Sequence, residues 1–272
     1  MEFHCVKLEE VCRQKDAEFL GILNDIKYGR NLQNVIAYLE SNQSSDLMEE
    51  APYLVGTNAK ADKINQAHMR ALDEKTEKKF WAIIEGDVTY EDIKNISFAK
   101  QSLVVNVGAK VMLTANDANG EYVNGTMGTI IDISKERGDA TCIQVLTDKG
   151  KKVDVYRYER EIERQDIEES KEKDKNGETV IVKKIVRKIV GSFKQFPIKI
   201  AWAMSIHKSQ GQTFGQVNID PRCWDSGQFY VAVSRAESVA GIHFMDLIRK
   251  QYIRTLSDEV IKILKESLYS II

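Results

Sequence analysis

One stretch near residue 200 constrains the fold more than any other part of the chain. Pro197 fixes φ and lacks a backbone N–H, so it suits the first residue of a strand or a sheet edge. After it, the apolar residues Ile198, Ile200 and Trp202 alternate with their neighbours, which predicts a strand. The pattern becomes polar at Ser205, which is a good helix N-cap. We therefore expect a strand that feeds directly into a polar turn.

The polar turn has the chemistry of an anion site. Residues 206–210 predict a short helix that Gly211 ends by adopting positive φ. Free N–H groups and the positive end of the helix dipole favour a phosphate at its start, with Lys208 and two hydroxyls alongside. The alternative is an ordinary surface turn after a buried strand, and the spacing alone does not separate the two.

Composition limits the setting and the partners. The 272 residues suit two domains, or one domain with a large insertion. The net charge of −2 means that any nucleic-acid site must be a local patch. The 4 cysteines form no C-x-x-C pair, which predicts a reducing cytoplasm and no metal site. Because no apolar run is long enough to span a bilayer and no signal-peptide pattern is present, we expect no membrane partner.

A phosphate cradle of the Walker A type is missing from this sequence. No G-x-x-x-x-G-K-[ST] pattern occurs, and Lys208-Ser209 lacks the preceding glycines. The chain by itself therefore cannot bind a nucleoside triphosphate in the manner of a P-loop enzyme.

Four segments resemble one family of DNA helicases. PIKIAWAMSIHKSQGQTF (197–214) resembles motif V of superfamily 1 DNA helicases, and GQFYVAVSRAESVAGIHF (227–244) resembles motif VI. The closest match is the petite-integration-frequency (Pif-type) family and its RecD-like relatives. GTNAKADKINQAHMRAL (56–72) and LVVNVGAKVMLTANDANGEYVNGTMGTIIDI (103–133) resemble further segments of that family. Two long motifs in the same order at close spacing are a specific signal.

The resemblance implies an α/β fold with a RecA-like parallel sheet flanked by helices, as in P-loop NTPases but without the P-loop, and an inserted small all-β barrel. Residues 51–103 and 197–250 would form the second RecA-like domain of a helicase. Residues 104–196 would form the barrel with a charged hairpin. Residues 1–50 would be a helical lead-in from the first domain, and 251–272 a C-terminal helix.

The resemblance also implies residues that complete an ATP site. The family places an arginine in VAVSRA, here Arg235, where it acts on the γ-phosphate. A fifth segment, LEEVCRQKDAEF (8–19), resembles the family's motif IV region and gives Arg13 the same role, with Gln14 beside it. Cys12 stands where phenylalanine is usual, which affects packing more than charge. Gln210 and Gly211 are further nucleotide-binding candidates. ATP and Mg²⁺ would be used by the full-length enzyme, with the Mg²⁺ ligands upstream.

Candidate contacts to single-stranded DNA come from two places. The motif V turn gives Ser205, His207, Lys208 and Ser209, and the end of the predicted strand 53–57 gives Thr57 and Asn58. Ligands of open α/β sheets gather at such strand ends. Alternatively, Asn58 only caps its helix, and His207 only orients its turn. Which motif V residues face DNA and which face the nucleotide stays open.

The function implied is the C-terminal portion of an ATP-dependent 5′→3′ DNA helicase. Its partners would be single-stranded DNA and an upstream RecA-like domain of the same polypeptide, and the chain alone would not hydrolyse ATP. The alternative is a non-catalytic module that binds single-stranded nucleic acid. A third option is a docking domain that uses the charged segment 159–190 and the tail. That segment is either a solvated hairpin or, through Lys183–Lys188, the border of a DNA groove.

Overall fold

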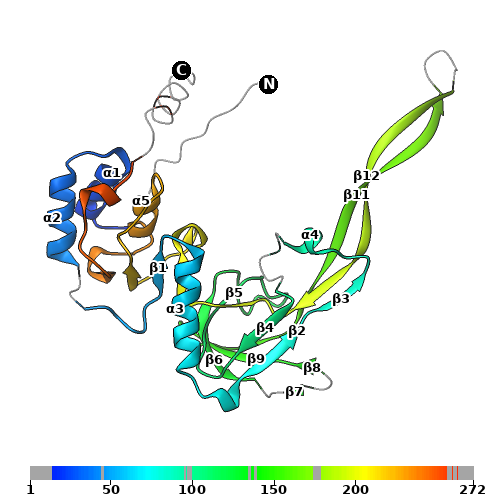
Figure 1. Ribbon diagram of the computed structural model, residues 1–272, viewed down its shortest axis with the longest axis horizontal. Helices are drawn as coiled ribbons and strands as arrows, with labels where there is room; N and C mark the ends of the chain where they lie inside the picture. Colours follow the sequence, from blue (N-terminus) through cyan, green and yellow to red (C-terminus); the bar gives the residue numbers. More distant parts are fainter. Residues whose placement is uncertain are drawn as a thin grey trace. The chain divides into compact units, whose positions relative to one another are not determined.

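The computed structural model describes residues 14–43, 46–94, 96, 100–133, 136–137, 140–173, 179–255, 259 and 262. The chain forms two compact units (Figure 1). Met1–His68 and Ala201–Ile272 form one, called here the α/β unit, and Met69–Ile200 form the other, called the β unit. Among the described residues, no helix has the length and apolar character needed to cross a bilayer.

The α/β unit is built on a four-stranded sheet in the order β14-β1-β15-β16. Its strands are β1 (Tyr53–Val55), β14 (Ala203–Ser205), β15 (Val217–Ile219) and β16 (Ile242–Phe244). All neighbouring strands are parallel. Every residue of β14 and β15 is buried, as expected for a parallel sheet covered on both faces. The predicted RecA-like parallel sheet is therefore confirmed.

Helices flank this sheet. They are α1 (Ala17–Tyr28), α2 (Leu32–Asn42), α3 (Asn58–Arg70) and α5 (Gln228–Val233), with short 3₁₀ turns η2 (Ile206–Ser209), η3 (Val239–Gly241) and η4 (Lys250–Tyr252). The Asp16 carboxylate accepts from the N–H groups of Glu18 and Phe19 and so begins α1, and Gly29 ends it at a φ of 68°. Ala61 of α3 packs on β1 and β14.

The β unit contains an antiparallel sheet in the order β10-β9-β6-β5-β13. These strands are β5 (Lys110–Leu113), β6 (Met127–Asp132), β9 (Ile143–Thr147), β10 (Lys152–Val155) and β13 (Ile198–Ile200). Two further pairs join β2 (Lys78–Trp81) to β4 (Ser102–Val105) and β7 (Glu136–Arg137) to β8 (Ala140–Thr141). Short helical turns lie at η1 (Glu74–Thr76) and α4 (Tyr90–Ile93). The all-β insertion is thus present.

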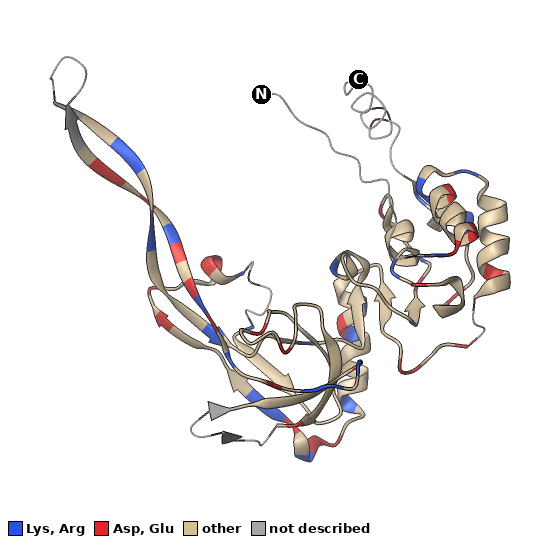
Figure 2. Cartoon of the chain, turned by 180° about the vertical axis from the view of Figure 1, so that it is seen from behind, with Lys and Arg blue, Asp and Glu red and all other residues tan. Residues whose placement is uncertain are grey.

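A long hairpin extends from the β unit (Figures 1 and 2). It pairs β11 (Tyr158–Lys173) with β12 (Thr179–Gln195), and β3 (Ile83–Gly86) adds a third strand along the end of β12 at 191–194. Gly191 permits this contact, because a Cβ there would lie 2.0 Å from the Glu85 carbonyl oxygen.

The cations of the hairpin face acidic partners across the ribbon. Nζ of Lys183 lies 3.0 Å from Glu169, and Nζ of Lys188 lies 2.8 Å from Asp166. Exposed pairs of this kind contribute little to stability. This pairing favours the solvated hairpin over the border of a DNA groove.

The structure differs from the sequence prediction in where elements end. The strand predicted across Ile198, Ile200 and Trp202 ends at Ile200, and a second strand, β14, begins at Ala203; β13 pairs with β5 whereas β14 pairs with β1.

The division into units also differs from the boundaries drawn at 103/104 and 196/197. Residues 69–103 fold with the β unit, because β2 pairs with β4 and β3 pairs with β12. Residues 198–200 also belong there, through β5. Residues 1–13 of the predicted lead-in, and all of the predicted helix 251–272 beyond residue 255 except 259 and 262, lie outside the described residues.

Candidate functional site

The carboxyl ends of the parallel strands bring four chain segments to one edge of the α/β unit. The turn η2 follows β14, Gly56 and α3 follow β1, Asp220 follows β15, and Asp246 lies just beyond β16. Ligands of open α/β sheets bind at this edge. The predicted DNA-contact residues all belong to two of these segments.

The backbone of the motif V turn matches the prediction, but its two serine side chains are buried and not available to a phosphate. The η2 turn starts directly after β14, and Gly211 adopts a φ of 86°. Ser205 and Ser209 are buried, and the Ser209 hydroxyl donates to the Ile206 carbonyl at 2.7 Å. The Ser209 hydroxyl therefore serves the turn itself, and Ser205, although it precedes the turn as predicted, makes no side-chain cap bond.

The side chains that the motif V turn leaves exposed are those of His207, Lys208 and Gln210, and Gly211 is exposed as well. Nε2 of His207 lies 3.6 Å from the carboxylate of Asp225. This contact fits the alternative in which His207 orients its turn, while Lys208 carries the exposed positive charge.

The turn after β1 is capped by a residue other than the one expected. The Thr57 hydroxyl accepts from the Lys60 N–H at 3.3 Å, so Thr57, not Asn58, provides the side-chain cap of α3. Asn58 is the first helical residue. Both side chains are exposed at the sheet edge.

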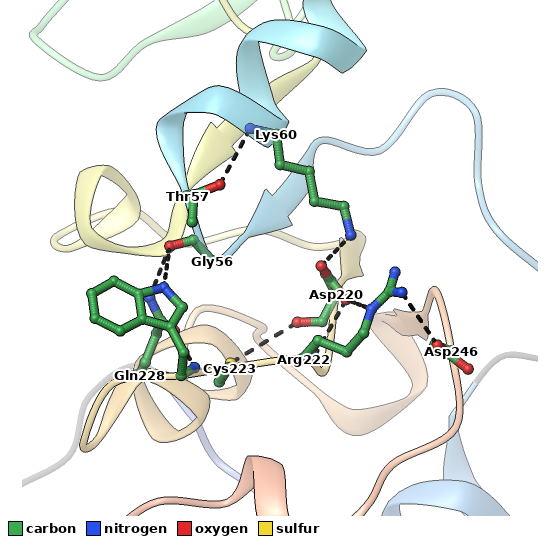
Figure 3. A network of polar contacts seen from close by, with 9 residues as sticks. Gly56, Thr57, Lys60, Asp220, Arg222, Cys223, Gln228 and Asp246 are labelled. Carbon is green, nitrogen blue, oxygen red and sulfur yellow. Dashed lines mark hydrogen bonds and ion pairs between the residues drawn. The ribbon is translucent and has the colours of Figure 1, made fainter.

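A buried carboxylate stabilises this edge (Figure 3). Asp220 is 3% exposed, pairs with Nζ of Lys60, and accepts from Nε of Arg222 at 3.0 Å. Arg222 also lies 3.7 Å from Asp246. Burial alone raises the pKa of the Asp220 carboxyl, but the hydrogen bonds from Lys60 and Arg222 outweigh it and hold that pKa below its usual range.

The turn after β1 is also tied to the start of α5. The Gly56 carbonyl accepts from Nε1 of Trp224 and from Nε2 of Gln228, both at 3.1 Å. Oε1 of Gln228 accepts from the Trp224 N–H at 3.1 Å. Gly56 allows this approach, since a Cβ there would lie 3.3 Å from Cδ1 of Trp224. The motif VI helix is thus joined to the segment that carries Thr57 (Figure 3).

Arg235 lies just past the other end of α5 and is 9% exposed. Its Nε donates to the Val231 carbonyl at 3.0 Å, Nη1 to the Gln212 carbonyl at 3.3 Å, and Nη2 to the Ser234 hydroxyl at 3.0 Å. The guanidinium group therefore joins the end of α5 to the segment after the motif V turn.

The Gln14 side chain connects the N-terminal segment to the residues on either side of Arg235. Its side chain is buried, and Nε2 donates to the carbonyls of Ser234 and Ala236, each at 3.0 Å. These two carbonyls bracket Arg235 in the chain. Arg13 lies outside the described residues. The structure thus places the Gln14 side chain against the backbone on either side of Arg235.

A hollow of about 210 Å³ opens between η2 and α5. His207 and Gln210 line it from η2 and the residue after it, and Gln228 and Tyr230 line it from α5. Cavities for drug-sized ligands measure about 300–1,000 Å³, so this hollow alone is too small for a nucleotide. Among the described residues, no group of three His, Cys, Asp or Glu side chains is placed to hold a metal ion.

Sequence reasoning missed Asp220, Lys60 and Trp224. The available signal was position, because Asp220 and Trp224 come shortly after the buried strand β15. A charged residue at the carboxyl end of a buried strand is expected to face the ligand edge or to pair there.

We expect Gln14→Ala to lower the free energy of unfolding by about 1–3 kcal/mol, because two buried carbonyl oxygens lose their donor. Urea unfolding of the chain measures this difference. The exposed Gln33 of α2 is the control, and its alanine variant is expected to stay within about 0.5 kcal/mol of the parent. Equal effects of the two variants would contradict the role of Gln14.

These features define a class of protein. The sheet, its flanking helices and the all-β insertion are those of a RecA-like domain of the P-loop NTPase type, without a P-loop in this sequence. No family model matches the chain.

The particular proteins that the chain resembles are Pif1 helicases. It is 31% identical to the ATP-dependent DNA helicase Pif1 of Bdellovibrio bacteriovorus over 246 residues, which are 89% of this chain and 50% of that protein. It is 27% identical to Pif1 of Campylobacter jejuni over 87% of this chain and 52% of that protein. The chain thus spans about half the length of these relatives.

Solved structures of Pif1 helicases also match the chain. Bacteroides sp Pif1 in complex with ADP-AlF4 matches with a TM-score of 0.74 and 26% identity, over 98% of this chain and 57% of that one. Bacteroides Pif1 bound to ssDNA matches with a TM-score of 0.67 and 27% identity, over the same shares. The expected resemblance and fold class are therefore confirmed.

Proposed function

We propose that this chain is the C-terminal portion of an ATP-dependent 5′→3′ DNA helicase of the cytoplasm. It would supply contacts to single-stranded DNA and arginines that complete an ATP site. The observation that supports this most is the position of Arg235. It lies two residues past the end of α5, between the two carbonyls that Gln14 binds, and the first residue of α5, Gln228, donates to the Gly56 carbonyl before Thr57.

On the ATP side, the chain would contribute positive charge. Phosphoryl transfer is accelerated mainly by positioned cations on the γ-phosphate, and an arginine from a second domain is a common source. Arg235 fits this role chemically, with Arg13 as its companion, and Gln210 and Gly211 of the motif V turn are exposed. Walker A, Walker B and the Mg²⁺ ligands would belong to the upstream RecA-like domain. The similarity to a Pif1 complex with ADP-AlF4 supports this assignment.

On the DNA side, the exposed residues of the sheet edge would bind phosphates. Thr57, Asn58, His207 and Lys208 offer a hydroxyl, an amide, an imidazole and an ammonium group. Phosphate contacts of these types position a strand without reading its sequence. ATP binding between the two RecA-like domains would then close their cleft and shift their grip on the strand. The similarity to a Pif1 bound to ssDNA supports this assignment.

A second candidate function is a module that binds single strands without catalysis. The observation in its favour is that the Arg235 guanidinium donates to oxygens of its own unit through all three nitrogens. Such a module would bind DNA identically with and without nucleotide, even in the complete gene product. The helicase portion would change its DNA affinity when ATP binds.

We expect Lys208→Ala to weaken binding of the chain to single-stranded DNA to a similar degree for every base sequence. It is also expected to reduce the slope of log K against log salt by about 0.7, because one phosphate contact is lost. Fluorescence anisotropy with labelled oligonucleotides at several salt concentrations measures both. Lys149, exposed in the turn between β9 and β10, is the control. An unchanged slope for Lys208→Ala would remove Lys208 from the interface.

A further inference from the structure

We propose that Trp224 is a platform on which one nucleobase of the bound single strand stacks. This inference rests on the proposed function, since it adds a base contact to the phosphate contacts at the same sheet edge. The ligand class is a nucleobase in a single strand, whose two faces are free.

Trp224 presents a large aromatic surface to solvent. Its side chain is 54% exposed. Among the described Phe, Tyr and Trp residues of the α/β unit, it is the one exposed side chain. Trp202, by contrast, is 6% exposed and stacks on His68 at a centroid distance of 5.2 Å. Trp202 is therefore a packing residue, whereas the ring of Trp224 is accessible to a ligand.

The Trp224 indole is held in place before any ligand arrives. Nε1 donates to the Gly56 carbonyl at 3.1 Å, and the Trp224 N–H donates to Oε1 of Gln228 at 3.1 Å. The polar edge of the ring is therefore satisfied, so a stacking partner would cover carbon surface without removing a hydrogen bond. A ring that is already fixed loses little rotamer freedom on binding, which favours affinity.

The position of Trp224 relates it to both proposed DNA-contact segments. Its indole binds the carbonyl of Gly56, the residue before Thr57. The next residue in the chain, Asp225, lies 3.6 Å from Nε2 of His207 in the motif V turn. Proteins that bind single strands without sequence preference combine phosphate contacts with aromatic rings on which bases stack. Trp224 would supply the aromatic ring, and the segments that carry Thr57 and His207 would supply the phosphate contacts.

The experiment compares an oligothymidylate with an abasic oligonucleotide of equal length, bound to the 272-residue chain. We expect Trp224→Leu to weaken binding of the base-containing strand by roughly 5- to 150-fold. The same variant is expected to bind the abasic strand as the parent does. Trp224→Phe, which keeps a ring but loses the N–H donor, is expected to retain most of the affinity.

The slope of log K against log salt is expected to stay unchanged in Trp224→Leu, because stacking releases no counterions. In a Trp81→Phe background, the base-containing strand should quench the remaining exposed tryptophan, and the abasic strand should not.

Three results would overturn the proposal. Equal affinity of Trp224→Leu and the parent for the base-containing strand would show that no base stacks there. A parallel loss of affinity for the abasic strand, or equal losses in the Phe and Leu variants, would show that Trp224 only supports the Gly56 turn. Failure of the parent chain to bind either strand at low salt would overturn the proposed DNA function itself and this proposal with it.

Discussion

Replacing Arg235 by alanine in the complete gene product is expected to lower DNA-stimulated ATP hydrolysis by about 10³- to 10⁵-fold. The reason is that a cation supplied from a second domain neutralises charge that develops on the transferring phosphoryl group. Single-strand affinity is expected to change little, because Arg235 belongs to the ATP side of the proposed site. Steady-state hydrolysis with saturating oligonucleotide, measured beside DNA binding, checks both statements.

Arg235 also has structural contacts, so this experiment needs controls. Its side chain donates to the carbonyls of Val231 and Gln212, and alanine would remove both bonds. Arg235→Lys keeps a charge but not the planar fork, so we expect it to fold normally and remain severely impaired. Arg249→Ala removes an exposed arginine of the same unit and is expected to keep parental turnover. Turnover of Arg235→Ala within tenfold of the parent would contradict the catalytic role.

Replacing Asp220 by asparagine is expected to lower the free energy of unfolding at pH 7 by about 2–3 kcal/mol. The change removes a buried carboxylate and turns an amide toward Lys60 and Arg222. The loss stays below that of a fully buried ion pair, because the side chains of Lys60 and Arg222 are 33% and 48% exposed and can be hydrated.

The effect of Asp220 on stability depends on pH in a defined direction. The folded-state pKa of Asp220 lies below its unfolded value, which is about 3.9 for aspartate. Its contribution is therefore complete above the unfolded pKa and is lost as the pH falls through the folded pKa. Urea unfolding from pH 7 down to about pH 2.5 is expected to show parent and Asp220→Asn converging in acid. Asp246, 41% exposed and 3.7 Å from Arg222, is the control. A gap that persists in acid, or one no larger than that of Asp246→Asn, would contradict this account.

Local patterns in the sequence determined the class of fold and the order of its elements. The apolar alternation after Pro197 predicts a strand, and β13 forms at Ile198–Ile200. The polar turn and the positive φ of Gly211 also follow from residues a few positions apart. The resemblance assigned Gln14 and Arg235, far apart in the chain, to one ATP site, which stays a prediction; the hydrogen bonds of Gln14 reach the residues on either side of Arg235.

The tertiary structure decided what depends on partners distant in sequence. Alternation across 198–202 could not show that the strand divides between two sheets, because that depends on the edges offered by β5 and β1. The burial of Ser205 and Ser209 also depends on how their turn packs.

Contacts between residues distant in sequence also determine the environments of Asp220 and Trp224. A sequence shows their types, but a carboxylate stays ionised in a buried site only where cations such as Lys60 reach it across 160 residues. Likewise, the Trp224 indole is held because the Gly56 carbonyl, 168 residues away in the chain, accepts its N–H. The sequence by itself determined the elements and the kind of chemistry. The long-range hydrogen bonds and ion pairs, which exist only once the sheet has formed, decided which side chains are held and which are free to bind.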